Sequence, residues 1–77
     1  MTAPARPVID VRDMLCAQAI MAAAKAAKPL APGAACDIIC NAADVQRDLL
    51  LWANEMQFTV SDVVEGAGDI RLTITRR

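Results

Sequence analysis

An alanine-rich segment, MLCAQAIMAAAKAAK at residues 14–28, restricts the possible folds more than any other part of the chain. Alanine is the best helix former, and Ile20 is the only β-branched residue in the run, so the segment predicts a helix. Asp13 is a candidate N-cap, and Pro29 would end the helix because proline cannot continue it. The side chains are small, so this helix can pack close to a neighbouring layer.

Four other segments have the composition and spacing of β-strands. They cover residues 7–11, 35–40, 58–64 and 70–75. The second is a short apolar run typical of a buried strand, and the last alternates apolar and polar residues. The sequence EGAGD joins the last two segments and indicates a hairpin turn.

A second helix is expected to follow the strand that ends at residue 40. Asn41 is its candidate N-cap, with Asp44 three positions on in a variant of the capping box. One apolar stripe at helical spacing would bind this helix to the core. The stripe consists of Val45, Leu49, Trp52 and Met56.

The resulting order, β-α-β-α-β-β, predicts an α+β fold. Both helices would cover one face of a four-stranded mixed sheet, giving a two-layer α/β sandwich. The other face of the sheet is expected to be solvated or to serve as a weak self-association surface. Its expected members are Thr59, Ser61, Arg71, Thr73 and Thr75.

The length of 77 residues allows one small domain, which we place at residues 7–77 behind a flexible tail at residues 1–6. The net charge of −1 gives no electrostatic case for direct binding of nucleic acid or of an anionic membrane. No apolar run reaches the roughly 18 residues that a membrane span needs. The first residues lack a signal-peptide pattern, so we expect a cytoplasmic protein.

The absence of histidine excludes a cysteine–histidine hydrolase and leaves few ligands for zinc. The glycines form no phosphate-binding loop. Three cysteines without framework spacing argue against a disulfide-stapled secreted domain. We therefore expect neither a metal ion nor another cofactor.

The three cysteines have different predicted environments. Cys36 and Cys40 lie on an expected strand, where four residues span about 13 Å. A disulfide needs Cα atoms within roughly 7 Å, so these two are expected to be unpaired core residues.

Cys16 lies in the first turn of the first expected helix, where free backbone N–H groups and the helix dipole favour an anion. A thiol there can have its pKa lowered and become a nucleophile, or it can simply pack the start of the helix. Arg12 would add positive charge nearby. Asp13 would act in the opposite direction.

The chain resembles the TusA/SirA/YedF family of small sulfur carriers, whose signature runs approximately L-D-x-R-G-L-x-C-P-x-P before a helix. The aligned stretch is IDVRDMLCAQA at residues 9–19, with the aspartate, the arginine and the cysteine in register. The turn LAPG at residues 30–33, the segment around Arg47-Asp48 and Trp52, and the strand IRLTI also match. The resemblance covers about residues 7–77.

The resemblance implies that Cys16 carries a persulfide and relays sulfane sulfur between proteins. The donor would be a cysteine desulfurase or a rhodanese-type protein, and the acceptor another sulfur-relay protein. Uses in the family include tRNA thiolation, cofactor biosynthesis and sulfur oxidation. Arg12 would steer the partner or the persulfide, and Gln18 would lie near the mouth of the site. We expect a monomer that performs covalent transfer rather than a conventional turnover enzyme.

The motif differs from the family pattern at three positions. Ala17 and Ala19 replace both prolines, and Asp13 replaces the glycine. These changes leave open a second hypothesis, in which the fold serves as a binding or regulatory module without sulfur transfer. A third hypothesis, a redox-sensing thiol, would need a resolving cysteine close to Cys16.

Overall fold

A computed structural model describes residues 7–77, apart from the side chain of Asp62. The elements follow the predicted order β-α-β-α-β-β. They are β1 (Val8–Asp10), α1 (Cys16–Ala27), β2 (Ala35–Cys40), α2 (Ala43–Glu55), β3 (Phe58–Gly66) and β4 (Asp69–Arg76). The tail that we expected at residues 1–6 lies outside the described residues.

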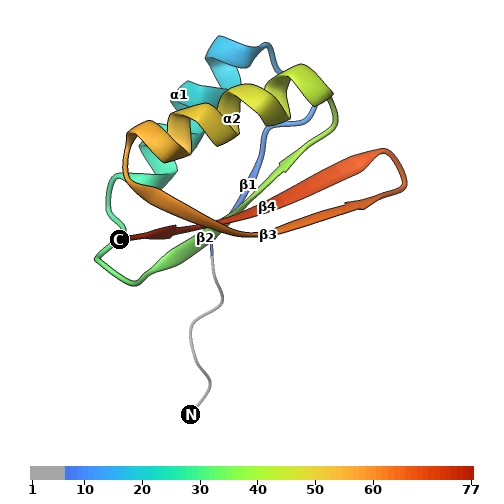
Figure 1. Cartoon of the computed structure of the whole chain (residues 1–77). Coiled ribbons are helices and arrows are strands. Elements are labelled where there is room, and N and C mark those ends of the chain that lie inside the picture. The colour runs from blue at the N-terminus through green and yellow to red at the C-terminus, as the bar shows by residue number, and fades with distance from the viewer. Residues whose placement is uncertain (1–6) are drawn as a thin grey trace.

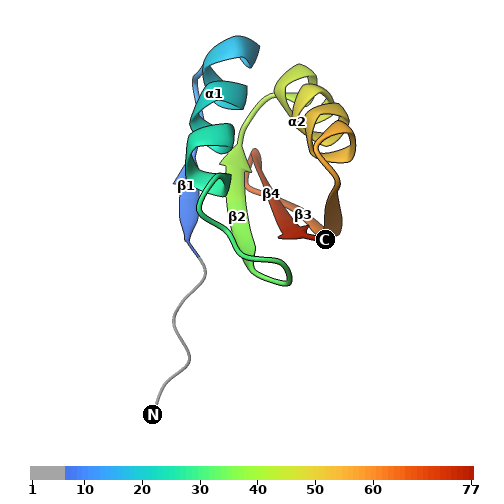
Figure 2. The same ribbon diagram turned by 90° about the vertical axis from the view of Figure 1, so that its left-hand side faces the viewer.

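The four strands form one mixed sheet in the order β1-β2-β4-β3. β1 runs parallel to β2, whereas β4 pairs antiparallel with both β2 and β3. Both helices cover the same face of this sheet and pack against each other, as Figures 1 and 2 show. The predicted two-layer sandwich is confirmed.

The core lies between the helices and the sheet. α1 contributes Ala19, Ala23 and Ala27, all at most 1% exposed, so its small face does pack closely. The other buried apolar side chains come from the second helix and from the strands of the sheet. They include Val45, Leu49 and Ala53 on α2, Cys36, Ile38 and Cys40 on β2, and Leu72 and Ile74 on β4.

The apolar stripe of α2 is confirmed at Val45 and Leu49 but not at Met56. Met56 is 56% exposed because α2 ends at Glu55 and the chain turns there. Trp52 is half-buried, and its ring stacks on Phe58 with 5.4 Å between the ring centroids. The aromatic pair therefore closes the end of the core where α2 meets β3.

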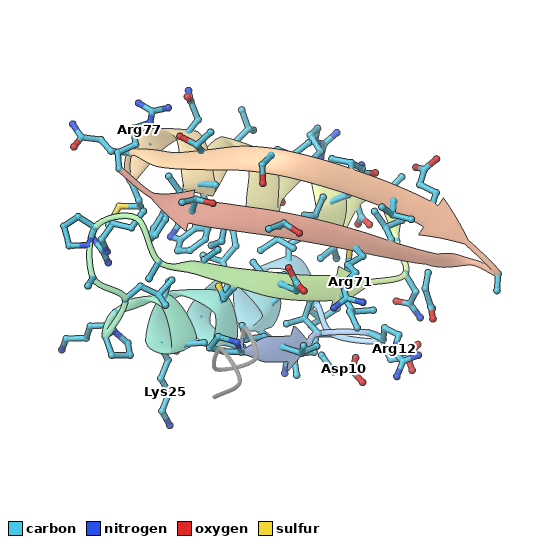
Figure 3. All side chains as sticks on the ribbon, turned by 90° about the horizontal axis from the view of Figure 1, so that it is seen from below. Asp10, Arg12, Lys25, Arg71 and Arg77 are labelled. Carbon is cyan, nitrogen blue, oxygen red and sulfur yellow. The ribbon has the colours of Figure 1, made fainter. Side chains whose placement is uncertain are left out.

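We expected all polar residues of the uncovered sheet face to be solvated, but Thr73 is buried. Thr73 is 4% exposed because its hydroxyl donates a hydrogen bond to Asp37, which is itself 1% exposed on the neighbouring strand. Arg71 pairs with the same carboxylate at 2.6 Å and lies on this face, away from the helices, in Figure 3. A buried carboxylate needs such partners, and Thr73 is buried with it.

The hairpin predicted at EGAGD forms at Ala67-Gly68. Both residues have positive φ values, 53° for Ala67 and 81° for Gly68. This conformation matches the twist of a two-residue hairpin turn and is easy for glycine. The turn fixes the pairing of β3 with β4.

Candidate functional site

Cys16 is the first residue of α1, and its side chain is half-buried. The helix starts two residues later than predicted because Leu15 has an extended backbone and serves as the N-cap residue. Gln18 accepts a hydrogen bond from the Leu15 N–H at 3.1 Å, which fixes the entry of the chain into the helix. The structure thus places the Gln18 side chain on the backbone of the residue before Cys16. Cys36 and Cys40 are fully buried, as predicted.

Asp13 does not cap α1, contrary to the prediction. Its backbone has a φ of 63°, and its carboxylate accepts a hydrogen bond from the Asn41 amide at 2.9 Å. The Asn41 side-chain oxygen accepts one from the Asp13 N–H at 3.0 Å. Asn41 is engaged in this exchange and is not the N-cap of α2, which is Ala42.

The left-handed backbone at residue 13 gives a physical reason for a glycine in the family motif. Glycine adopts positive φ without steric cost, and aspartate tolerates it better than most residues. Asp13 can therefore adopt the backbone conformation that favours glycine, and the hydrogen bonds with Asn41 help to hold it. The Asp13 carboxylate therefore bonds to Asn41 in this turn and does not cap the helix N-terminus.

Arg12 is engaged away from the thiol. Its guanidinium pairs with Asp10 at 2.8 Å and with Asp69 at 3.1 Å. Figure 3 shows Asp10 and Arg12 next to each other at the end of β1. The hydrogen bonds from Arg12 lower the pKa of Asp10 to about 2. The two ion pairs of Arg12 therefore connect the end of β1 to the start of β4.

Two carboxylates of α2 face Cys16 instead. The Sγ atom lies 3.8 Å from Oδ2 of Asp44, and Asp48 follows one helical turn later. The hydrogen bond to Asp48 raises the pKa of the Cys16 thiol, and burial and the negative charges of both carboxylates raise it further. These contributions oppose the lowered pKa that the helix N-terminus would favour.

Sequence reasoning did not find Asp44 and Asp48 as neighbours of the thiol. Their spacing of four on an expected helix shows that they share one face. Nothing local to either helix shows that this face meets the start of α1. Asp44 was assigned to a capping box with Asn41, but α2 has no side-chain cap.

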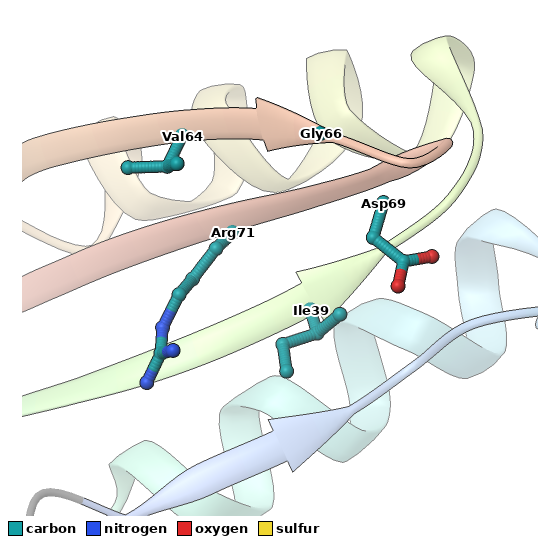
Figure 4. A pocket seen from close by; sticks show the side chains of 5 residues that line it. All are labelled: Ile39, Val64, Gly66, Asp69 and Arg71. Carbon is teal, nitrogen blue, oxygen red and sulfur yellow. The ribbon is translucent and has the colours of Figure 1, made fainter.

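The uncovered sheet face has an open hollow of about 250 Å³, shown in Figure 4. Its lining residues are Ile39, Val64, Gly66, Asp69 and Arg71. Cys16 is not among them, so the hollow is separate from the thiol site. Among the side chains that the structure describes, no cluster of three cysteines or acidic residues is arranged to hold a metal ion. Neither described helix is long and apolar enough to cross a membrane.

Comparisons with known proteins agree with this architecture. The crystal structure of a SirA-like protein from Desulfitobacterium hafniense superimposes with a TM-score of 0.77 at 21% sequence identity, covering 88% of this chain and 93% of that one. At this identity the likeness shows the fold. No curated protein matches the sequence. The family model described as sulfurtransferase TusA matches residues 8–76. The chain therefore belongs to the TusA family of sulfurtransferases.

Proposed function

We propose that this protein is a sulfur carrier that accepts sulfane sulfur on Cys16 and passes it to a partner protein. The observation that carries the proposal is the contrast among the three cysteines of a TusA-family chain. Cys36 and Cys40 are fully buried, whereas Cys16 reaches the surface at the first residue of α1. Cys16 is also the residue that aligns with the sulfur-bearing cysteine of the family motif.

The chemistry has two steps of the same kind. In loading, the Cys16 thiolate attacks the terminal sulfur of a donor's persulfide, the donor's S–S bond breaks, and the donor cysteine leaves as a thiolate that takes up the proton from Cys16. In unloading, an acceptor thiolate attacks the terminal sulfur of the Cys16 persulfide. The S–S bond at Cys16 breaks, and Cys16 leaves as a thiolate. The first-turn N–H groups of α1 favour the persulfide anion between these steps.

The surroundings of Cys16 are suited to contact with another protein. Leu15 is 73% exposed immediately before the thiol, and Met14 is also exposed. Exposed apolar side chains beside a reactive group are typical of an interaction site. We propose a donor of the cysteine desulfurase or rhodanese type and a second sulfur-relay protein as acceptor. Action as a cytoplasmic monomer, and the steering role of Arg12, stay predictions.

A binding or regulatory role without sulfur transfer is the second candidate. The raised pKa of Cys16 favours it, because a thiol that stays protonated is a weak nucleophile. A redox-sensing thiol has less support. It would need a resolving cysteine, and Cys36 and Cys40 are both fully buried.

Loading by a donor protein tests the carrier proposal. The protein is incubated with a cysteine desulfurase and cysteine, or with a rhodanese and thiosulfate, and its intact mass is measured. We expect the mass to increase by one sulfur atom and the Cys16→Ser variant to stay unmodified. An unmodified parent protein with both donors would contradict the carrier proposal and leave the binding role.

A further inference from the structure

The contact between Cys16 and α2 places negative charge directly at the reacting sulfur. Asp44 Oδ2 is 3.8 Å from Sγ, and Asp48 lies on the same helix face four residues later. The side chain of Asp48 is 31% exposed, so solvent screens its charge only in part. Any group that attacks Cys16, or is attacked by it, must enter the field of these two carboxylates.

The charged groups around Cys16 do not cancel this field. Arg12 is paired with Asp10 and Asp69. Arg47 contacts Asp48 at 3.5 Å, but its side chain is 70% exposed and such a pair is weak. Asp13, on the loop before α1, is bonded to Asn41. Among the described residues, the partial positive charge at the α1 N-terminus is the remaining favourable element for an anion.

A persulfide is a stronger acid than a thiol, so a donor's persulfide approaches Cys16 largely as an anion. Two like charges about 4 Å apart in water repel by enough to slow a reaction about fivefold. A donor can remove this repulsion by bringing positive side chains that pair with the carboxylates. This argument rests on the proposed function, since it concerns the choice of sulfur donor.

We propose that Asp44 and Asp48 determine the specificity of Cys16 by charge: they disfavour anionic reaction partners and favour a donor protein whose persulfide cysteine is flanked by lysine or arginine side chains. The two residues act on the approach of the donor, and the bonds that form and break in the exchange stay the same. The Sγ atom still forms a bond to the terminal sulfur, and the donor's S–S bond still breaks.

Exchange with three small disulfides tests this proposal without any sulfur donor. Cystamine carries positive charge, 2-hydroxyethyl disulfide is neutral, and dithiodiglycolate carries negative charge. All three react with the same thiolate at a given pH. The ratio of the cystamine rate to the dithiodiglycolate rate therefore does not depend on the pKa of Cys16. The Cys16→Ser variant corrects for any reaction at Cys36 or Cys40.

We expect this ratio to exceed that of N-acetylcysteine amide, an uncharged reference thiol, by about fivefold or more. The Asp44→Asn and Asp48→Asn variants should each lower the ratio, and the double variant should approach the reference. Glu55→Gln is the matched control, because it removes one charge about 10 Å along α2 from Asp48 and should leave the ratio unchanged.

High salt should also reduce the ratio of the parent protein, a result that requires no variant. A parent ratio equal to that of the reference thiol would overturn the proposal. So would equal effects of Glu55→Gln and of the two aspartate variants. Failure of persulfide loading with unchanged charge selectivity would instead count against the sulfur-carrier function alone.

Discussion

The sulfur of Cys16 lies 3.8 Å from a carboxylate oxygen of Asp44, although 28 residues separate the two in the chain. The contact joins the first turn of α1 to the first turn of α2. It reverses the expected chemistry of the thiol, because the helix N-terminus alone would favour a thiolate. The site therefore combines a nucleophile with neighbours that hold it in its protonated form.

The pH dependence of alkylation should reveal these neighbours. The carboxylates disfavour the thiolate, so the midpoint of the Cys16 reaction with iodoacetamide should lie above the ordinary cysteine value of 9.0. Asp48→Ala removes the hydrogen bond, which is the largest cause, together with the charge, and should move the midpoint down, which raises the rate at neutral pH. A midpoint below 9.0 in the parent protein would show that the helix N-terminus dominates instead.

Two substitutions at residue 13 should separate backbone strain from hydrogen bonding. Asp13→Gly and Asp13→Ala both remove the side-chain bond with Asn41. Only glycine accepts a φ of 63° without steric cost, so the glycine variant should be more stable by about 1–2 kcal/mol. Urea unfolding of both variants measures this difference. Equal stabilities would mean that the loop relaxes out of the left-handed conformation.

The buried carboxylate on the uncovered sheet face should make Thr73 important for stability. Thr73→Val removes the hydroxyl that lies 2.7 Å from Asp37 Oδ1, and we expect a loss of about 1–3 kcal/mol in the free energy of unfolding. Thr75→Val is the matched control, since it makes the same change two residues along this face where the side chain is less buried. Equal losses in both variants would argue against a specific role for the Asp37 contact.

Asp10 should titrate well below the usual range of an aspartate. Hydrogen bonds from Arg12 lower its pKa from 3.8 to about 2 in the folded protein. A lowered folded-state pKa stabilises the fold above pH 3.8, and this contribution is lost as the pH falls through about 2. NMR titration of the carboxyl carbon measures the value directly. In Arg12→Gln it should return toward 3.8, and an unchanged value would exclude Arg12 as the cause.

Local sequence patterns were sufficient for the order of the elements. Helix propensity marked α1, and the alternation of Ile70, Leu72 and Ile74 marked the core face of β4, where Leu72 and Ile74 are buried. The same patterns put Cys16 in the first turn of a helix and Cys36 and Cys40 in the core. Each of these features depends on residues within a few positions of one another, because the helical and strand periods are local.

The caps and the electrostatics of the site depended on contacts that no local pattern contains. Asp13 and Asn41 were each expected to cap a helix, yet they bond to each other across 28 residues. Arg12 is joined to Asp69, 57 residues away. A side chain that can hydrogen-bond locally takes a distant partner when packing brings one within reach.

The sequence by itself determined that this chain forms a two-layer sandwich with one cysteine at a helix start and two in the core. The tertiary structure alone decided that the cysteine meets Asp44 and Asp48 rather than Arg12. The physical reason is that the packing of α1 against α2 sets which charges lie within a few ångströms of the sulfur, and Coulomb energies depend on that distance.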